Sequence, residues 1–129
     1  MSHFAYVQDG VVQEVIVAEQ DFINGLPERP GRWIQTSYNT RQNKHILGGT
    51  PLRGNYAGVG YVYDEEHDVF YPPCPFRGWR LDHAIWDWVP GRPYPEDGKN
   101  YAWNQHEQDW VEIEFDPVTN EPIIPWDQT

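Results

Sequence analysis

The alternation of apolar and polar residues is clearest near the start of the chain. Residues 4–7 and 11–17 read as strands, and they flank Asp9 and Gly10. This dipeptide accepts the positive φ angles of a two-residue type I′ turn, whose twist matches that of an antiparallel strand pair. The pattern therefore predicts a β-hairpin at the start of the chain.

The residues that follow favour a short helix and then a third strand. Residues 18–25 predict the helix, with Phe22, Ile23 and Leu26 facing the sheet, and a glycine and a proline end the pattern. After a further glycine, residues 33–38 alternate again and predict the third strand.

Residues 39–58 show no regular alternation of apolar and polar residues, and they hold several glycines and a proline. A connection of this length without regular structure is usually functional or becomes ordered on a partner. Arg41, Lys44 and Arg53 lie here and make up three of the nine basic residues of the chain. We therefore expect a contact loop in this segment.

The second half contains a degenerate repeat of three units at a spacing of roughly twenty residues. Each unit has an aromatic residue, any residue, an apolar residue, Asp or Asn, a polar turn and an aromatic strand. Asp64, Asp82 and Asn104 fit the first turn position, where the side chain bonds the backbone two residues on. The sequence thus predicts a mainly β fold: an N-terminal β domain with a short helix and a long loop (1–58), followed by aromatic β-hairpin repeats that pack on it (59–116).

The last residues, 117–129, contain three prolines and carry apolar side chains at Ile123, Ile124 and Trp126. Proline favours extended polyproline II and is excluded from central strands. Fully extended, this tail would reach about 40 Å. An apolar tip on such a tail predicts a C-terminal arm that grips a neighbouring molecule.

The composition changes this picture in two ways. Aromatic residues are 16% of the chain while the hydrophobic fraction is 39%, so rings supply much of the apolar surface. Such rings suit thin cores and partner surfaces. The net charge is −11, from 20 acidic and 9 basic residues. This balance argues against nucleic acid and membranes as partners, because both are anionic.

No pattern in the chain predicts catalysis or a cofactor. Cys74 is the single cysteine, so an internal disulfide is excluded, and no basic residue beside it favours a thiolate. The glycine-rich stretches lack the lysine of a phosphate-binding loop, and a nucleophile elbow is absent. The start of the chain does not resemble a signal peptide, and no apolar run has the length of a membrane span. We expect synthesis in a cytoplasm and no enzymatic activity.

Three histidines raise the question of a metal site. His67, His83 and His106 fall in the predicted turns, next to several carboxylates, and would form a site if the turns converged. Their offsets from the preceding Asp or Asn differ, so the spacing is not that of a ligand motif. Solvated turn residues are the favoured interpretation, and no metal is predicted.

The tryptophans allow two interpretations. Exposed rings would stack on sugars and indicate a carbohydrate-binding protein, whereas buried rings would form the core of a sheet poor in leucine and isoleucine. The core is the favoured interpretation for most of them. The residues concerned are Trp79, Trp86, Trp88, Trp103 and Trp110.

Several short stretches of the sequence resemble those of small proteins of tailed bacteriophages, especially marine and cyanobacterial ones. The resemblance lies in residues 4–18, 33–40, 52–61 and 95–99, and in the short aromatic and proline units between them. It implies a virion or tail-associated role. It carries over no functional residues, because the likeness is not one of a catalytic motif.

These observations lead to a first hypothesis: a non-enzymatic, capsid-decorating or tail-associated structural protein, assembled in the host cytoplasm and located in the virion. Its expected partners are other virion proteins, with further copies of itself and glycans as additional candidates. The alternative hypothesis is a carbohydrate-binding appendage that contacts the host surface. The expected contact residues are Arg41, Lys44, Arg53, Ile123, Ile124 and Trp126.

Overall fold

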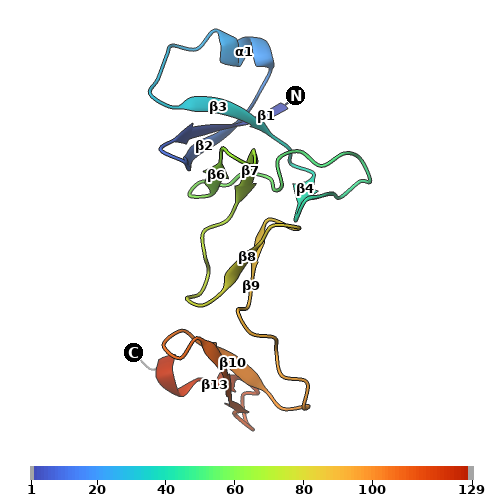
Figure 1. Ribbon diagram of the computed structural model, residues 1–129, viewed down its shortest axis with the longest axis vertical. Helices are drawn as coiled ribbons and strands as arrows, with labels where there is room; N and C mark the ends of the chain where they lie inside the picture. Colours follow the sequence, from blue (N-terminus) through green and yellow to red (C-terminus); the bar gives the residue numbers. More distant parts are fainter. Residues whose placement is uncertain (1, 128–129) are drawn as a thin grey trace. The chain divides into compact units, whose positions relative to one another are not determined.

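The computed structural model describes residues 2–127 and is mainly β, which confirms the predicted fold class (Figure 1). Within these residues the chain forms two compact units. The first unit contains the chain up to Pro73 together with Leu81–Trp88, and the second contains Cys74–Arg80 together with the residues from Val89 onward.

The first unit is built on a five-stranded sheet, in the order β3-β1-β2-β6-β7, whose neighbouring strands are antiparallel. Its strands are β1 (Ser2–Gln8), β2 (Val11–Ala18), β3 (Arg32–Thr36), β6 (Val62–Asp64) and β7 (Val69–Tyr71). The first hairpin of the repeat, β6–β7, thus belongs to the N-terminal sheet. The compact units therefore do not follow the boundaries expected after residues 58 and 116.

The predicted N-terminal hairpin is present as β1–β2. Asp9 and Gly10 have φ angles of 54° and 76°, as a type I′ turn requires. The pairing register shifts between Tyr6 and Val7, so that β2 holds one extra residue there. Such a bulge increases the local twist of the strand pair.

The predicted short helix is α1 (Gln20–Asn24). Ile23 and Leu26 are half-buried and share a cavity with Tyr6, but Phe22 is 58% exposed. The expectation that Phe22 faces the sheet is wrong, because Ile23 of α1 and Leu26, just after the helix ends, are the side chains that lie beside Tyr6. Within residues 2–127 no helix has the length and apolar character needed to cross a membrane.

The core of the first unit lies on one face of the sheet and consists of Ala5, Val7, Val12, Ile34, Ala57, Tyr63 and Phe70. On the other face Tyr6 is 1% exposed, its hydroxyl accepts the N–H of Gly31 at 2.7 Å, and the Arg29 guanidinium lies 3.8 Å from the ring centre. A Cβ atom on Gly31 would lie 2.1 Å from the carbonyl oxygen of Val7, so this close approach requires glycine.

The segment expected to be an irregular loop contains a small hairpin. Strands β4 (Thr40–Arg41) and β5 (Lys44–His45) pair around Gln42 and Asn43, whose φ angles are 47° and 60°. Both turn residues thus have the positive φ angles of the Asp9–Gly10 turn, in a sequence without glycine at the turn. Asn tolerates this conformation better than most residues, and the hairpin was missed because Gln does not signal it. We call residues 40–50 the finger, and it stands out from the sheet in Figure 1.

The remaining strands form two-stranded hairpins: β8 (Arg80–Asp82) with β9 (Asp87–Val89), β10 (Tyr101–Asn104) with β11 (Asp109–Glu112), and β12 (Glu114–Phe115) with β13 (Pro122–Ile123). Side-chain caps are present in all three predicted turns, two residues on at Asp82 and Asn104 as predicted and three residues on at Asp64. The Asp64, Asp82 and Asn104 side chains accept the backbone N–H groups of His67, Ala84 and His106 at 3.1, 2.8 and 2.9 Å. The predicted repeat is therefore a recurring hairpin with a capped turn.

A fourth copy of this turn was not predicted. The Asp116 side chain accepts the N–H of Val118 at 2.8 Å and starts the turn of the β12–β13 hairpin. The fourth residue after each capping residue has a φ angle of 51° to 58° in all four hairpins. These positions are Asp68, Trp86, Gln108 and Asn120.

The hairpin β12–β13 corrects the expectation of an extended C-terminal arm. Residues 117–123 turn back and pair with Glu114–Phe115, and a 3₁₀ helix, η1 (Pro125–Asp127), follows. The Asp116 cap provides the turn that reverses the chain. Gln128 and Thr129, the last two residues of the predicted arm, lie outside the described residues.

Candidate functional site

Asn55 holds the base of the finger to the first unit through three hydrogen bonds. Its Oδ1 accepts the N–H of Gln42 at 2.9 Å, and its Nδ2 donates to the carbonyl oxygens of Phe70 at 2.8 Å and Trp86 at 2.7 Å. The side chain is buried, with 8% of the residue exposed. Both donors and the acceptor of the amide are thus used, which fixes its orientation.

The segment around Asn55 also covers both edges of the five-stranded sheet. The outer strands of this sheet are β3 and β7. The Arg53 guanidinium donates to the carbonyl oxygen of Gln35 in β3 at 3.0 Å, and the N–H of Phe70 in β7 donates to the carbonyl oxygen of Arg53 at 2.9 Å. The N–H of Ala57 donates to Thr36 Oγ1 at 2.9 Å. We call residues 53–57 the clasp, because they join two strands that would otherwise present open edges.

Arg53 is therefore occupied by contacts within its own unit. Its Nε donates to the carboxylate of Asp68 at 2.8 Å, and the hydroxyl of Tyr63 donates to the same carboxylate. Burial raises the pKa of Asp68, but hydrogen bonds from Tyr63 and Arg53 outweigh it and hold the pKa below its usual value. Burial, together with the bond to Asp68, raises the pKa of Tyr63. The prediction that Arg53 contacts a partner remains a prediction, made for a side chain already engaged internally.

The finger has a fixed base and an exposed apolar tip. Thr40 is fully buried, its Oγ1 accepts the N–H of Leu52 at 3.1 Å, and its carbonyl oxygen accepts the N–H of Tyr56 at 2.8 Å. At the tip, Ile46 is 58% exposed and Leu47 is 76% exposed. A rigid base thus presents two large apolar side chains to solvent.

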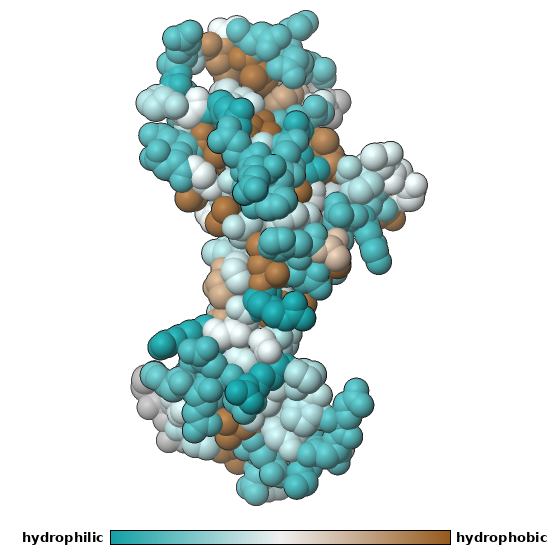
Figure 2. Space-filling view, in the orientation of Figure 1, coloured by the Kyte–Doolittle hydropathy of each residue, from teal (hydrophilic) through white to brown (hydrophobic). Residues whose placement is uncertain are grey.

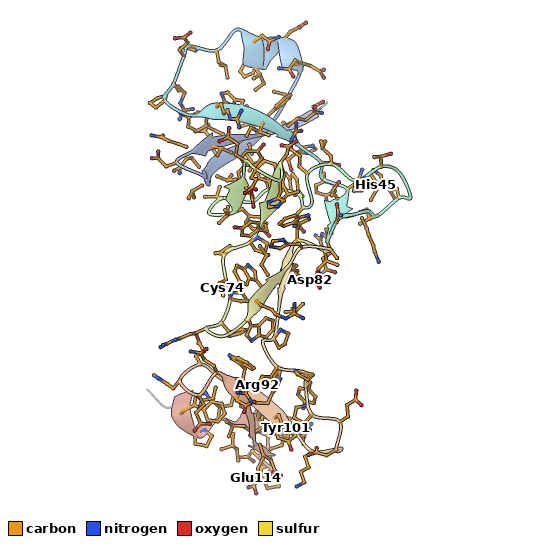
Figure 3. The ribbon with its side chains drawn as sticks, in the orientation of Figure 1. His45, Cys74, Asp82, Arg92, Tyr101 and Glu114 are labelled. Atoms are coloured by element: carbon orange, nitrogen blue, oxygen red, sulfur yellow. The ribbon has the colours of Figure 1, made fainter. Side chains whose placement is uncertain are left out.

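His45 shapes the tip of the finger (Figure 3). Its Nδ1 accepts the backbone N–H groups of Leu47 and Gly49, both at 3.1 Å. The predicted contact residues Arg41 and Lys44 are exposed on the strands that lead to this tip. The two cations therefore belong to the same projecting element as the apolar tip.

A cavity of about 560 Å³ opens where the finger joins the sheet. Across it, Gln42 Nε2 donates to Asp87 Oδ2 at 3.0 Å, which ties the finger to the first residue of β9. The side chains that line this cavity include Arg41, Gln42, Asn55, Tyr56, Tyr61 and Asp87. Arg41 could be identified from the sequence but the others could not, because the lining residues come from five separate segments.

In the second unit, two of the predicted contact residues line a cavity of about 370 Å³. Ile124 and Trp126 are half-buried there beside Trp103 and His106, whereas Ile123 is 41% exposed in β13. The six predicted residues are thus divided between the two units. Their role as contacts remains a prediction.

The histidines are explained by packing and turn capping. The rings of His67 and His83 lie 5.5 Å apart, and both pack on Trp86, while His106 belongs to the second unit. Asp64, Glu66 and His67 offer ligand atoms within 4.8 Å of one another. However, both Asp64 oxygens already contact His67, at 3.1 and 2.9 Å, and this hydrogen bonding lowers the Asp64 pKa. The group therefore functions as a turn cap.

The tryptophans are buried or half-buried at all five positions considered above. Three of them donate their indole N–H to a backbone carbonyl: Trp88 to Pro72 at 2.7 Å, Trp103 to Arg77 at 2.8 Å and Trp110 to Arg92 at 2.8 Å. Trp79 Nε1 is buried without a partner in the described part of the chain. The rings thus hold hairpins to connecting segments, and the carbohydrate-binding alternative remains a prediction.

The comparisons with known proteins yield no relative. No protein-family model matches the chain, and no curated protein or solved structure matches it.

Proposed function

We propose that this chain is a non-enzymatic structural or accessory protein of a tailed phage virion, either a capsid decoration or a tail-associated component. It acts through protein–protein contacts, with other virion proteins or further copies of itself as partners. The phage assignment is supported by the resemblance of short sequence stretches to small proteins of tailed bacteriophages. The contact role is supported by the finger, whose tip is exposed and apolar while its base is fixed.

The finger carries this proposal because of the contrast between its two ends. Thr40 and Asn55 form buried hydrogen bonds that fix the base, whereas Ile46 and Leu47 leave much of their apolar surface in water. Burying that surface against a partner would be favourable by about 25 cal/mol per Å². A loop held in its binding conformation before contact also loses less entropy on binding.

The setting of the finger favours a protein partner over an anionic polymer. The face in view in Figure 2 is largely hydrophilic, and the chain carries a net charge of −11. Arg41 and Lys44 place positive charge near the apolar tip. A partner with an apolar recess bordered by carboxylates would match both features.

Mass spectrometry of purified particles of the encoding phage tests the virion assignment, and incorporation of finger variants tests the contact. We expect the wild-type chain in the particles and a loss of at least tenfold in incorporation for an Ile46→Asp, Leu47→Asp double variant. Val59→Asp is the matched control, because Val59 is 71% exposed and lies outside the finger.

Absence of the wild-type chain from purified particles would contradict the virion assignment. Equal incorporation of the finger variant and the control would contradict the contact role of the finger. The two parts of the proposal can therefore fail separately.

A further inference from the structure

The cavity beside the finger brings together polar groups that have no hydrogen-bond partner among the described residues. The guanidinium of Arg41 and the hydroxyls of Tyr56 and Tyr61 form no hydrogen bond within residues 2–127, and all three side chains line the cavity. Tyr56 and Tyr61 are half-buried, so part of each ring also contributes apolar wall. Its volume of about 560 Å³ lies in the range of small-molecule binding sites.

Hydrogen-bond acceptors face the same space. The Asp87 carboxylate accepts the N–H of Trp88 through Oδ1 at 2.8 Å and the Gln42 amide through Oδ2 at 3.0 Å. Each carboxylate oxygen has a second lone pair, and the Gln42 amide oxygen has no partner within the described residues. The cavity therefore offers acceptors for hydroxyl donors as well as a cation and two phenolic hydroxyls.

The part of the cavity wall formed by Asn55 and Gln42 is fixed before any ligand binds. Asn55 uses all its hydrogen-bonding groups within the unit, and Gln42 is held by the β4–β5 turn, by Asn55 and by Asp87. Thr40, next to Arg41, is fully buried. A cavity whose walls are ordered in advance loses little entropy when a ligand enters.

We propose that this cavity binds a monosaccharide that carries a carboxylate, that is, a hexuronate. The carboxylate would pair with the Arg41 guanidinium, which has the planar geometry for a bidentate contact. The sugar hydroxyls would bond the tyrosine hydroxyls and donate to Asp87 and Gln42. The apolar sugar face would lie against the tyrosine rings and Pro72, which also lines the cavity.

The acidic composition of the chain does not oppose this ligand. Exposed charges farther away than about 8 Å are largely screened at physiological salt, so the charges that matter are those lining the cavity, the Arg41 guanidinium and the Asp87 carboxylate. The ligand carboxylate would therefore lie at Arg41 and a sugar hydroxyl at Asp87. A polyanion would span many acidic residues and would be repelled. The proposal is independent of the virion assignment, and it uses no tryptophan.

Binding to the purified full-length chain by calorimetry, with D-glucuronate, D-glucose and acetate as probes, tests the proposal. We expect glucuronate to bind with a Kd of about 1 mM, as its size allows. Glucose, which lacks the carboxylate, and acetate, which lacks the sugar ring, should each bind at least about tenfold more weakly.

Two variants and a control locate the site. Arg41→Gln should remove the preference for glucuronate over glucose, and Tyr61→Phe should weaken both sugars several-fold. Lys44→Gln is the control, because Lys44 is an exposed cation on the same finger that does not line the cavity. Thermal melting of each variant establishes that it is folded.

Three results would each overturn the proposal. The first is no detectable binding of glucuronate by a folded chain. The second is equal affinity for glucuronate and glucose, or for glucuronate and acetate. The third is a loss in Lys44→Gln as large as that in Arg41→Gln, which would indicate general charge attraction.

Discussion

The two units of the chain use the same kind of hairpin but stabilise it differently. In the first unit, β6–β7 joins the five-stranded sheet, shares its apolar core and is bound by the clasp. In the second unit, β10–β11 and β12–β13 each pair within themselves, and turn caps and indole–carbonyl bonds hold them. An isolated two-stranded hairpin is marginally stable in water. Sheet membership therefore distinguishes the units more than the turn sequence does.

The largest expected change in stability comes from removing the Asn55 side chain, which binds the clasp to the backbone around it. Asn55→Ala should lower the free energy of unfolding of the first unit by about 3 kcal/mol, because it leaves two buried carbonyls and one N–H without their partner. Urea denaturation, followed by the amide signals of β1, β2 and β3, measures this.

Asn104→Ala is the matched control, because both asparagines are 8% exposed. Asn104 caps a turn in the second unit, so its loss should cost about 1 kcal/mol and should affect the β10–β11 hairpin only. A loss of the same size for both variants would contradict the distinction between the units.

A second comparison uses one steric clash in each unit. A Cβ on Gly31 would lie 2.1 Å from the Val7 carbonyl oxygen, and a Cβ on Gly91 would lie 2.1 Å from that of Gly78. Gly31→Ala should destabilise the first unit by about 2 kcal/mol, because the sheet cannot shift away. Gly91→Ala should cost less than half as much, since it lies in an exposed connection. Thermal melting of the two variants gives the difference, and equal costs would count against the account.

A smaller gain is expected from the turn residue with positive φ in the second unit. Gln108 has a φ angle of 51°, a conformation that glycine adopts without steric cost. Gln108→Gly should stabilise the β10–β11 hairpin by about 0.5 kcal/mol, whereas Gln105→Gly, in the same turn without positive φ, should not. Amide exchange rates of residues 101–112 report the effect, and slower exchange in neither variant would refute it.

The smallest effect is a pH dependence of the first unit. Because the pKa of Asp68 is lowered on folding, its contribution is present above the pKa of the unfolded chain and is lost as pH falls through the folded pKa. Stability should therefore decrease by a few tenths of a kcal/mol below about pH 4. In urea titrations at several pH values, Asp68→Asn should remove this decrease in stability at low pH. An unchanged decrease would exclude Asp68 as its cause.

Local signals in the sequence predicted a good part of the fold. Asp9–Gly10 identified the first hairpin, and Asp64, Asp82 and Asn104 identified three capped turns. The Asp116 turn was missed, because it follows Asn104 by 12 residues instead of about twenty and contains proline.

The clasp and the cavity could not be predicted from the sequence. Asn55 binds the backbone carbonyls of Phe70 and Trp86, and a carbonyl carries no sequence signal. The cavity combines side chains from five segments that meet only in the folded unit. Arg53 was identified as a contact residue from its charge, but its local environment is decided by Asp68 and Gln35.

Hydrogen exchange of the purified full-length chain tests the central claim most directly. If the clasp closes the first unit around its core, the amides of β1, β2 and β3 should exchange together through global unfolding of that unit. The amides of β10–β11 and β12–β13 should exchange at least tenfold faster through local opening. Equal protection of the two sets of strands would contradict the account.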